Sequence, residues 1–423
     1  MPAIRGAPLA SDYAPAPPGL GAAFRMSPLV LLFLAIFNSI LGLSVLFPIL
    51  GMLGRELGLG ELQVGMLTTG YALAQLLAGP YWGRKSETHG RKPILLRGIL
   101  GFALTFLAFA IVAHLGRAGH IEGHALFALL LATRVLGGLW SSATLPTAQA
   151  YVADVTERAD RTAGMSVVGA AFGLGIVFGP AIGGLLAPFG LLVPVYLSSA
   201  IGFVNAFFVW RTLPEPQRSQ RPLEAPGLTR IASKFPALLA VAFTATLASV
   251  AMEQTVPFYF QDRLGLTTTG AARSVAVALV VYGIVAVIVQ GGFVRRTRWP
   301  PIRLVRVGIP LAALGLGALV FARTEPLLIA AMALQGLGQG LTLPGVAAAI
   351  SLRAGDDEQG GAAGLTSSSQ ALGRTVGPVL GTGLYEVRPE YPYVFGATLL
   401  VLVLLVAWFV SACPRTAPAS PRA

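Results

Sequence analysis

Charged side chains are scarce in this chain. They make up 11% of its 423 residues, whereas hydrophobic residues make up 55%. Soluble globular proteins contain about 25% charged residues, so the composition excludes a soluble fold and predicts an integral membrane protein. The net charge of +12 does not indicate a nucleic-acid partner, because the basic residues lie in short segments between apolar runs. That distribution is expected of a chain oriented in a bilayer.

Cysteine is nearly absent as well. Cys413 is the only one, which excludes an intrachain disulfide and a cysteine-based metal site. The four histidines are scattered along the chain and form no ligand motif: His89, His114, His120 and His124. H-E-x-x-H, G-x-S-x-G and P-loop patterns do not occur, and these are motifs of zinc peptidases, serine hydrolases and nucleotide-driven pumps. The sequence therefore predicts no enzyme, no metal and no cofactor.

Long apolar runs organise the chain. Each is long enough to supply about 20 helical residues, which cross a hydrocarbon core of about 30 Å. The predicted spans are 27–53, 62–83, 93–115, 124–150, 163–188, 190–212, 236–261, 268–294, 300–322, 325–352, 360–386 and 391–413. They predict an N-terminal six-helix bundle (27–212), a basic linker (213–235) and a C-terminal six-helix bundle (236–413).

The two ends of the chain lack long apolar runs. Residues 1–26 are rich in Ala, Pro and Gly and have no apolar core of the kind that a signal peptide needs. We therefore predict a disordered tail there and a second tail over 414–423.

Basic residues are divided unequally between the two sets of loops. With a cytoplasmic N-terminus, the cytoplasmic segments include residues 84–92, the linker, and five arginines between 295 and 306. The opposite loops hold only scattered arginines: Arg55, Arg117, Arg263, Arg323 and Arg388. Because Lys and Arg concentrate in cytoplasmic loops, both termini are predicted to be cytoplasmic.

Two glycine patterns recur in the chain at a common offset of 198 residues. Leu-Gly-x-x-x-Gly-Pro-x-x-Gly begins at Leu174 and again at Leu372. Gly-Leu, followed by Thr-Leu-Pro, begins at Gly138 and again at Gly336. The shared offset predicts that the fourth and fifth helices correspond to the tenth and eleventh, as in transporters built from two parallel repeats.

The first pattern covers residues 175–184. Its small residues are Gly175, Gly179, Pro180, Gly183 and Gly184. Glycines four residues apart share one helix face, where a second helix can approach closely, and Pro180 removes one backbone donor. Gly-x-x-x-Gly alone is equally consistent with a general packing contact. The full pattern resembles the antiporter motif on the fifth helix of drug exporters of the major facilitator superfamily (MFS).

A second pattern lies between the second and third apolar runs, at 83–93. It is similar to the MFS loop motif G-x-x-x-D-R-x-G-R-[KR], although Glu87 replaces the usual Asp and Thr88 the usual Arg. The resemblance implies a gating loop of Gly83, Glu87, Gly90, Arg91 and Asp154. We expect Arg91 to pair with Asp154, and the Glu87 carboxylate to approach the N-terminus of a helix in the other half. A turn of exposed positive-inside charges is the alternative.

Charges inside the apolar runs point most directly to function, because a charge in the membrane is costly unless it is paired or hydrated. Arg134, Glu253 and Arg374 lie well inside predicted helices. Arginine keeps its proton, whereas a carboxylate in low-dielectric surroundings holds its proton more tightly and can exchange it near neutral pH. We therefore predict Glu253 as the proton carrier and Arg134 as a second proton-coupling residue, with Arg134 or Arg374 acting on Glu253.

Neutral polar residues inside the runs complete the predicted site. The predicted substrate cavity comprises Asn38, Gln75, Ser141, Asn205, Gln254, Gln335, Gln339, Gln370 and Arg374. A hydrogen bond or ion pair between helices is the alternative for each of them.

The MFS resemblance extends over 27–413 and implies the fold: an all-α integral membrane protein with twelve transmembrane helices in two pseudo-symmetric six-helix bundles. It is nearest to the proton-coupled drug-exporter branch, which includes the tetracycline exporters. The implied function is proton-coupled antiport of small organic molecules or drugs by alternating access in the bacterial cytoplasmic (inner) membrane. A dedicated exporter of an endogenous metabolite, such as a siderophore or organic anion, is the alternative, and a receptor or scaffold is a different class. The predicted partners are a small-molecule substrate, protons and the bilayer, for a monomer without nucleic acid.

Overall fold

The computed structural model describes residues 28–156, 161–216, 232–355 and 358–412. These residues fold into helices and connecting turns, and none of them lies in a β-strand. The predicted tails and most of the predicted linker lie outside the described residues.

The first six predicted spans form the N-terminal half. Two of them consist of a pair of helices, α1 with α2 and α5 with α6, and the fifth continues into a short 3-10 turn, η2. The helices are α1 (Pro28–Ser44), α2 (Leu50–Glu56), α3 (Glu61–His89), α4 (Arg91–Arg117), α5 (Gly123–Ser141), α6 (Thr144–Val155), α7 (Arg161–Leu186), η2 (Ala187–Phe189) and α8 (Val193–Thr212).

The last six predicted spans form the C-terminal half. One of them ends in a π-helical segment, η3. The helices are α10 (Pro236–Leu264), α11 (Thr268–Ile288), η3 (Val289–Val294), α12 (Pro301–Phe321), α13 (Glu325–Ser351), α14 (Gln359–Val387) and α15 (Tyr391–Ala412). Every predicted span thus corresponds to one helix or one pair, in agreement with the predicted fold class.

Not all of these helices are equally apolar. In the described chain, eight helices are long and apolar enough to cross a membrane by length and composition, and α1 and α15 are shorter apolar helices. The two other long helices, α3 and α14, pack against each other across the two halves. A helix that faces protein rather than lipid needs fewer apolar residues, which explains why these two are the more polar ones.

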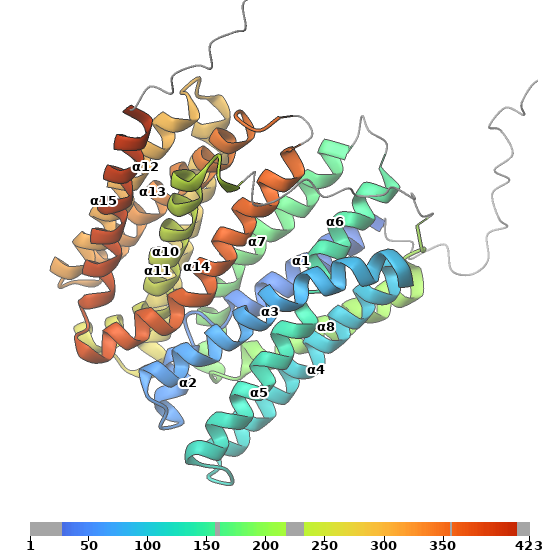
Figure 1. Cartoon of the computed structure of the whole chain (residues 1–423). Coiled ribbons are helices and arrows are strands. Elements are labelled where there is room, and N and C mark those ends of the chain that lie inside the picture. The colour runs from blue at the N-terminus through green and yellow to red at the C-terminus, as the bar shows by residue number, and fades with distance from the viewer. Residues whose placement is uncertain (1–27, 157–160, 217–231, 356–357, 413–423) are drawn as a thin grey trace, which may run out of the picture.

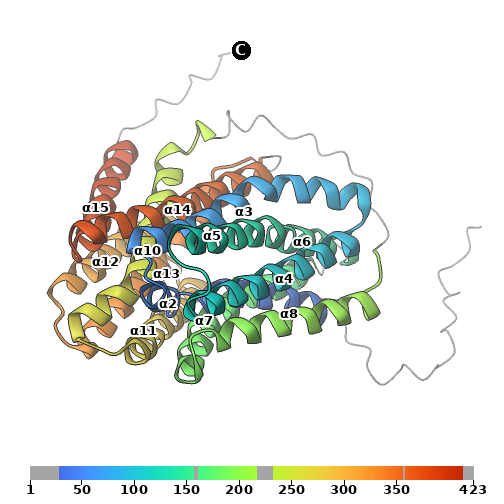
Figure 2. The same cartoon turned by 90° about the horizontal axis from the view of Figure 1, so that it is seen from below.

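The two halves meet along α3 with α14 and along α7 with α11. Figures 1 and 2 both show α14 beside α3 in the middle of the molecule, and the helices of the two halves converge toward one end in Figure 1. We call this end, formed by residues 56–61, 264–268 and 387–391, the closed end. We call the opposite end, where α3 ends and α4 begins, the open end.

The internal repeat is visible as matching helix contacts in the two halves. A Cβ atom on Gly138 would collide with the carbonyl oxygen of Tyr71 on α3. A Cβ atom on Gly336 would lie 2.5 Å from the carbonyl oxygen of Tyr282 on α11. The recurring glycine therefore has the same role in each half, where it lets the fourth helix approach the backbone of the second.

The glycines of the 175–184 pattern have a similar duplicated role. Gly179 lies directly against Ser44 of α1, whose hydroxyl donates a 2.8 Å hydrogen bond to the carbonyl oxygen of Gly175. Its counterpart Gly377 lies against α10, where an added Cβ atom would lie 3.1 Å from the carbonyl oxygen of Leu247. Each motif therefore joins the fifth helix of a half to the first.

Two further glycines of this pattern face different helices. Gly183 approaches the carbonyl oxygen of Val45 in the turn after α1, within the same half. Gly184 instead faces Ala272 and Ala276 of α11, so it belongs to the contact between the halves.

The contact at Gly179 predicts the effect of a larger side chain. Gly179→Leu should destabilise the protein by about 1–3 kcal/mol, because the added atoms overlap with Ser44 and the backbone of α1. Gly173→Leu on the same helix is the matched control, since a Cβ at Gly173 meets open space. Thermal unfolding of both purified variants in detergent measures the difference, and equal melting temperatures would contradict the predicted close contact.

Candidate functional site

Glu253 lies past the middle of α10, toward the closed end. Its carboxylate accepts a 3.1 Å hydrogen bond from the Ser249 hydroxyl, which lies 2.8 Å from the hydroxyl of Tyr282 on α11. Tyr282 also hydrogen-bonds to the carboxylate, and the guanidinium of Arg374 on α14 interacts with it electrostatically. A carboxylate, two hydroxyls and a guanidinium from α10, α11 and α14 therefore form one polar cluster inside the C-terminal half.

Arg134 on α5 forms a second cluster, in the N-terminal half. Its side chain is buried, and the guanidinium lies over the ring of Tyr71, 4.5 Å from the centroid. The Tyr71 hydroxyl is 2.6 Å from that of Ser141, which accepts a 3.3 Å hydrogen bond from Gln75. Among the described residues Arg134 forms no ion pair, and its Nε atom has no hydrogen-bond partner.

The structure does not bring Arg134 and Glu253 together. They lie in different halves, and Arg374 is the arginine whose charge acts on Glu253. Of the two arginines that the sequence offered as neighbours of Glu253, geometry supports Arg374, because α14 packs directly on α10 and carries this side chain to it.

The residues predicted to line a substrate cavity separate into two groups. Gln75, Gln370 and Arg374 are half-buried, whereas six are buried: Asn38, Ser141, Asn205, Gln254, Gln335 and Gln339. Asn38 of α1 and Gly202 of α8 are neighbours inside the N-terminal half, which places that amide between helices. Amide atoms of Asn38, Asn205, Gln335 and Gln339 find no partner among the described residues.

The predicted loop at the open end contains the Arg91–Asp154 ion pair. Arg91 Nε lies 2.9 Å from Asp154 Oδ2, and its Nη1 donates a 2.7 Å hydrogen bond to Ser86. Glu215 accepts hydrogen bonds from the backbone N–H groups of Arg91 and Lys92, at 2.5 and 2.9 Å. A carboxylate at this helix N-terminus is favourable, and it comes from Glu215 of the same half.

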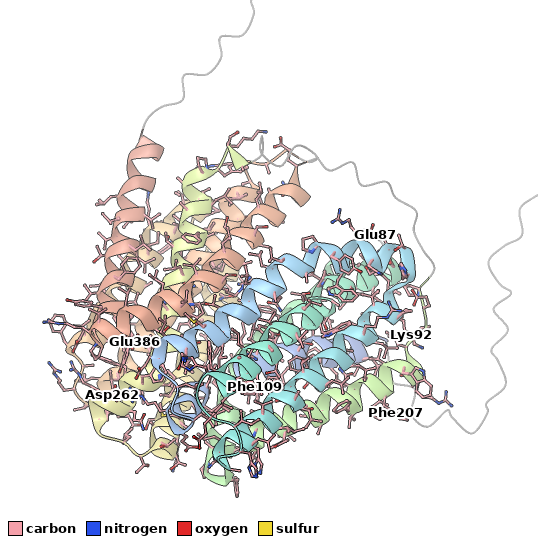
Figure 3. All side chains as sticks on the ribbon, turned by 60° about the horizontal axis from the view of Figure 1, so that its bottom comes forward. Glu87, Lys92, Phe109, Phe207, Asp262 and Glu386 are labelled. Carbon is pink, nitrogen blue, oxygen red and sulfur yellow. The ribbon has the colours of Figure 1, made fainter. Side chains whose placement is uncertain are left out.

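Glu87 has a different position from the one expected for it. It is exposed at the open end, apart from the closed end where Asp262 and Glu386 lie (Figure 3). Within the described part of the chain it forms no hydrogen bond or ion pair, so the expected approach to a helix of the other half does not occur in this conformation. The Arg91–Asp154 pair also stays within one half, between α4 and α6.

At the closed end, polar contacts join the two halves. Arg55, near the end of α2, donates hydrogen bonds to both carboxylate oxygens of Asp262 on α10, at 2.6 and 2.8 Å. Glu61 binds Arg55 at 2.8 Å, and Tyr385 of α14 donates a 2.7 Å hydrogen bond to Asp262. The hydrogen bond to Asp262 raises the pKa of the Arg55 guanidinium above its ordinary value, so Arg55 stays charged at physiological pH.

Two more contacts strengthen the closed end. Glu386 of α14 accepts a 2.9 Å hydrogen bond from the backbone N–H of Leu62, in the first turn of α3. Deeper along the same helices, the Thr69 hydroxyl donates to the carbonyl oxygen of Thr375 at 2.9 Å and accepts from the backbone N–H of Val379 at 3.2 Å. The halves are thus held by charged groups at the rim and by hydrogen bonds between α3 and α14 below it.

No metal centre accompanies these clusters: among the described residues, no three His, Cys, Asp or Glu side chains converge on one point. A model of the Major Facilitator Superfamily matches residues 32–325 and 297–423. The chain belongs to the major facilitator superfamily. It is a membrane transporter and not an enzyme.

Named relatives place this MFS chain in the drug-exporter branch. Multidrug resistance protein 1 of Bacillus subtilis (strain 168) is 27% identical over 388 residues, covering 90% of this chain and 96% of that protein. The class C tetracycline resistance protein of Escherichia coli is 27% identical over 383 residues, covering 86% and 92%. Among solved structures, a bacterial homologue of the human lysosomal transporter Spinster, inward-facing and occupied, matches with a TM-score of 0.71 at 15% identity, covering 93% of this chain and 98% of that one. That last likeness shows the shared MFS fold.

Several residues of these clusters were not found from the sequence. Ser249 lies four residues before Glu253, so helical spacing alone would have placed it on the same face. Tyr71 and Tyr282 carry no comparable signal, because a tyrosine in an apolar run is more often a packing residue. Asp262 was overlooked because its partner, Arg55, lies in the other half of the chain.

Removal of the Arg55 contact should loosen the closed end of this MFS transporter. Arg55→Gln removes the charge that binds Asp262, so the halves should separate there more often. In a Cys413→Ser background, a cysteine replacing the buried Thr382 should then react several-fold faster with a maleimide added from the closed-end side.

Arg117→Gln is the matched control for this measurement. Arg117 pairs with Glu56 at 3.4 Å near the closed end, but both residues belong to the N-terminal half. Its removal should leave the labelling rate unchanged. If Arg55→Gln labels no faster than Arg117→Gln, the Arg55–Asp262 contact does not hold the closed end.

Proposed function

We propose that this chain exports small organic molecules, drugs among them, across the bacterial cytoplasmic membrane in exchange for protons. The observation that carries the proposal is Glu253, a carboxylate held inside the C-terminal half by hydroxyls and by the charge of Arg374. The resistance proteins to which the chain is similar support the export of drugs.

Glu253 is suited to carry the proton because its surroundings stabilise both of its states. When the carboxylate is charged, Arg374 neutralises it and the hydroxyls of Ser249 and Tyr282 donate to it. When the carboxyl group is protonated, it can donate to one of these hydroxyl oxygens. Arg374 then loses its counter-charge, so protonation favours a rearrangement of α14 relative to α10.

A rearrangement of α14 would act on the contact between the halves. Arg374 directly precedes Thr375, whose carbonyl oxygen accepts the hydrogen bond from Thr69 of α3. The step from the proton site to the contact between the halves is therefore one residue along a single helix. This proximity supports alternating access in which proton binding changes the stability of the closed end.

The distribution of basic residues supports a cytoplasmic open end. The open end carries Arg84, Lys85, Arg91, Lys92 and the arginines between 295 and 306, and such residues concentrate on the cytoplasmic side. On this assignment both termini are cytoplasmic, and the conformation described here is closed toward the outside.

One observation favours a second candidate function, the export of an anionic metabolite. Arg134 is buried without an ion-pair partner among the described residues, and an unpaired buried charge is costly. A carboxylate or another anionic group of a substrate would neutralise it if the helices opened beside Tyr71. The charge of the transported molecule therefore distinguishes the two candidates.

The Glu253→Gln variant tests proton coupling. Glutamine keeps the size of the protonated side chain but cannot release a proton. We expect wild-type protein in proteoliposomes to move at least one of three probes (cationic ethidium, tetracycline, anionic carboxyfluorescein) against its gradient when a pH gradient is imposed. Glu253→Gln should abolish this uphill transport and the proton flux coupled to it.

Glu122→Gln, in an exposed loop, is the control and should transport as the wild type does. An unchanged substrate-dependent proton flux in Glu253→Gln would exclude Glu253 as the carrier. Accumulation of carboxyfluorescein alone would favour the anion exporter, and movement of none of the probes would count against drug export.

A further inference from the structure

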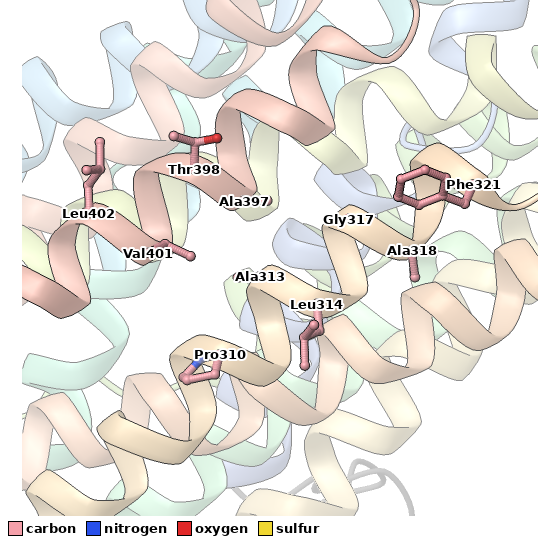
Figure 4. Close-up of a pocket in the computed structure, with 10 residues that line it drawn as sticks. All are labelled: Pro310, Ala313, Leu314, Gly317, Ala318, Phe321, Ala397, Thr398, Val401 and Leu402. Carbon is pink, nitrogen blue, oxygen red and sulfur yellow. The ribbon is translucent and has the colours of Figure 1, made fainter.

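An apolar groove lies on the outer surface of the C-terminal half, between α12 and α15. Six residues of α12 and four of α15 line a space of about 760 Å³, and Thr398 is the only polar residue among them. Figure 4 shows Pro310, Leu314 and Phe321 along one wall and Val401 and Leu402 along the other. Of these two helices, α12 packs mainly on α13 and α15, and α15 packs mainly on α10 and α12.

The floor of the groove is open where small residues lie. A Cβ atom on Gly317 would meet no atom within 4 Å. The side chain of Leu314, at the edge of the groove, is 61% exposed. In a membrane-spanning helix these residues face the hydrocarbon core, so the occupant must be apolar at this depth.

A basic cluster lies at the start of the same helix, at the open end. It comprises Arg295, Arg296, Arg298, Arg303 and Arg306, all of them exposed. No Asp or Glu occurs between Asp262 and Glu325. The guanidinium of Arg303 lies 4.2 Å from the ring centroid of Trp299, and Trp is the residue type that anchors helices at the membrane surface.

The cluster and the groove share one face of α12. On an α-helix, residues 303, 310, 314, 317 and 321 fall on the same side. Arg303 and Gly317 are about 21 Å apart along the axis at about 1.5 Å per residue. The headgroup region of one leaflet plus half of the hydrocarbon core spans about 20 Å.

We propose that an anionic phospholipid binds at this surface, with its phosphate at Arg303 and the basic cluster and one acyl chain in the groove as far as Gly317. The positive charge of the basic cluster places the lipid headgroup in the leaflet at the open end. The opposite end of the groove carries mixed charges, among them Glu325 and the Arg263–Glu390 ion pair at 3.3 Å. A phosphate is attracted to the end where five arginines lie within twelve residues of the chain.

Native mass spectrometry of the full-length protein tests this site with two lipids, dioleoyl phosphatidylglycerol and dioleoyl phosphatidylcholine. The two share acyl chains and differ in net headgroup charge. The wild type should retain more phosphatidylglycerol than phosphatidylcholine. Arg303→Gln should reduce phosphatidylglycerol retention about fivefold, which corresponds to about 1 kcal/mol per basic residue near an anionic headgroup, and should leave phosphatidylcholine unchanged.

Variants in the groove test the acyl-chain part of the site. Gly317→Leu fills the open floor and should reduce the retention of both lipids, as should Thr398→Leu on the exposed wall of α15. Arg323→Gln, at the other end of α12, and Gly173→Leu, in the other half, are the controls and should retain both lipids as the wild type does.

Three results would overturn the proposal. The first is equal retention of the two lipids by the wild type. The second is an Arg303→Gln variant that retains phosphatidylglycerol as Arg323→Gln does. The third is wild-type lipid retention by both Gly317→Leu and Thr398→Leu, which would show that the chain does not lie in the groove.

Discussion

The contact between the two halves at the closed end is the interaction on which the rest of the structure depends. Arg55 of the N-terminal half and Asp262 of the C-terminal half form a two-point ion pair, and α3 and α14 pack beside it. At the open end, the Arg91–Asp154 and Lys234–Glu358 ion pairs each stay within one half. The described ion pair between the halves thus lies at the closed end, and helix contacts continue from it along α3 with α14 and α7 with α11.

Small residues make this arrangement possible inside a membrane. Helices in lipid gain little from the hydrophobic effect and associate through close packing. A Cβ atom on Gly65 of α3 would lie 2.9 Å from the carbonyl oxygen of Pro378 on α14, and Gly184 lies similarly close to α11. Glycines therefore allow close helix approach both within each half and between the halves.

The charged residues inside the membrane fall into two clusters with different chemistry. Glu253 has a counter-charge and two hydroxyls, and that counter-charge, Arg374, directly precedes Thr375, which contacts α3. Arg134 lies over the aromatic ring of Tyr71, and among the described residues it has no carboxylate partner. The first cluster is suited to binding and releasing a proton, and the second is suited to receiving negative charge from elsewhere.

The sequence predicted the helices and the repeat well, because apolar length and glycine spacing are local properties. The matched roles of Gly138 and Gly336 follow directly from the offset between them. Contacts between the halves were not predictable, since Arg55 and Asp262 are joined only by the tertiary fold. Burial was also missed: Asn38 and Gln335 are polar residues in apolar runs, and the sequence could not show that both are buried in this conformation.

Protonation of Glu253 is expected to shift the chain between two arrangements of its halves, and distance measurements between spin labels test this expectation most directly. In a Cys413→Ser background, labels at Thr88 and Leu352 report on the open end, and labels at His120 and Thr269 report on the closed end. Between alkaline and acidic pH, one distance should shorten while the other lengthens, and Glu253→Gln should abolish this response. Distances that do not change with pH in the wild type, or that change equally in Glu253→Gln, would contradict this role of Glu253.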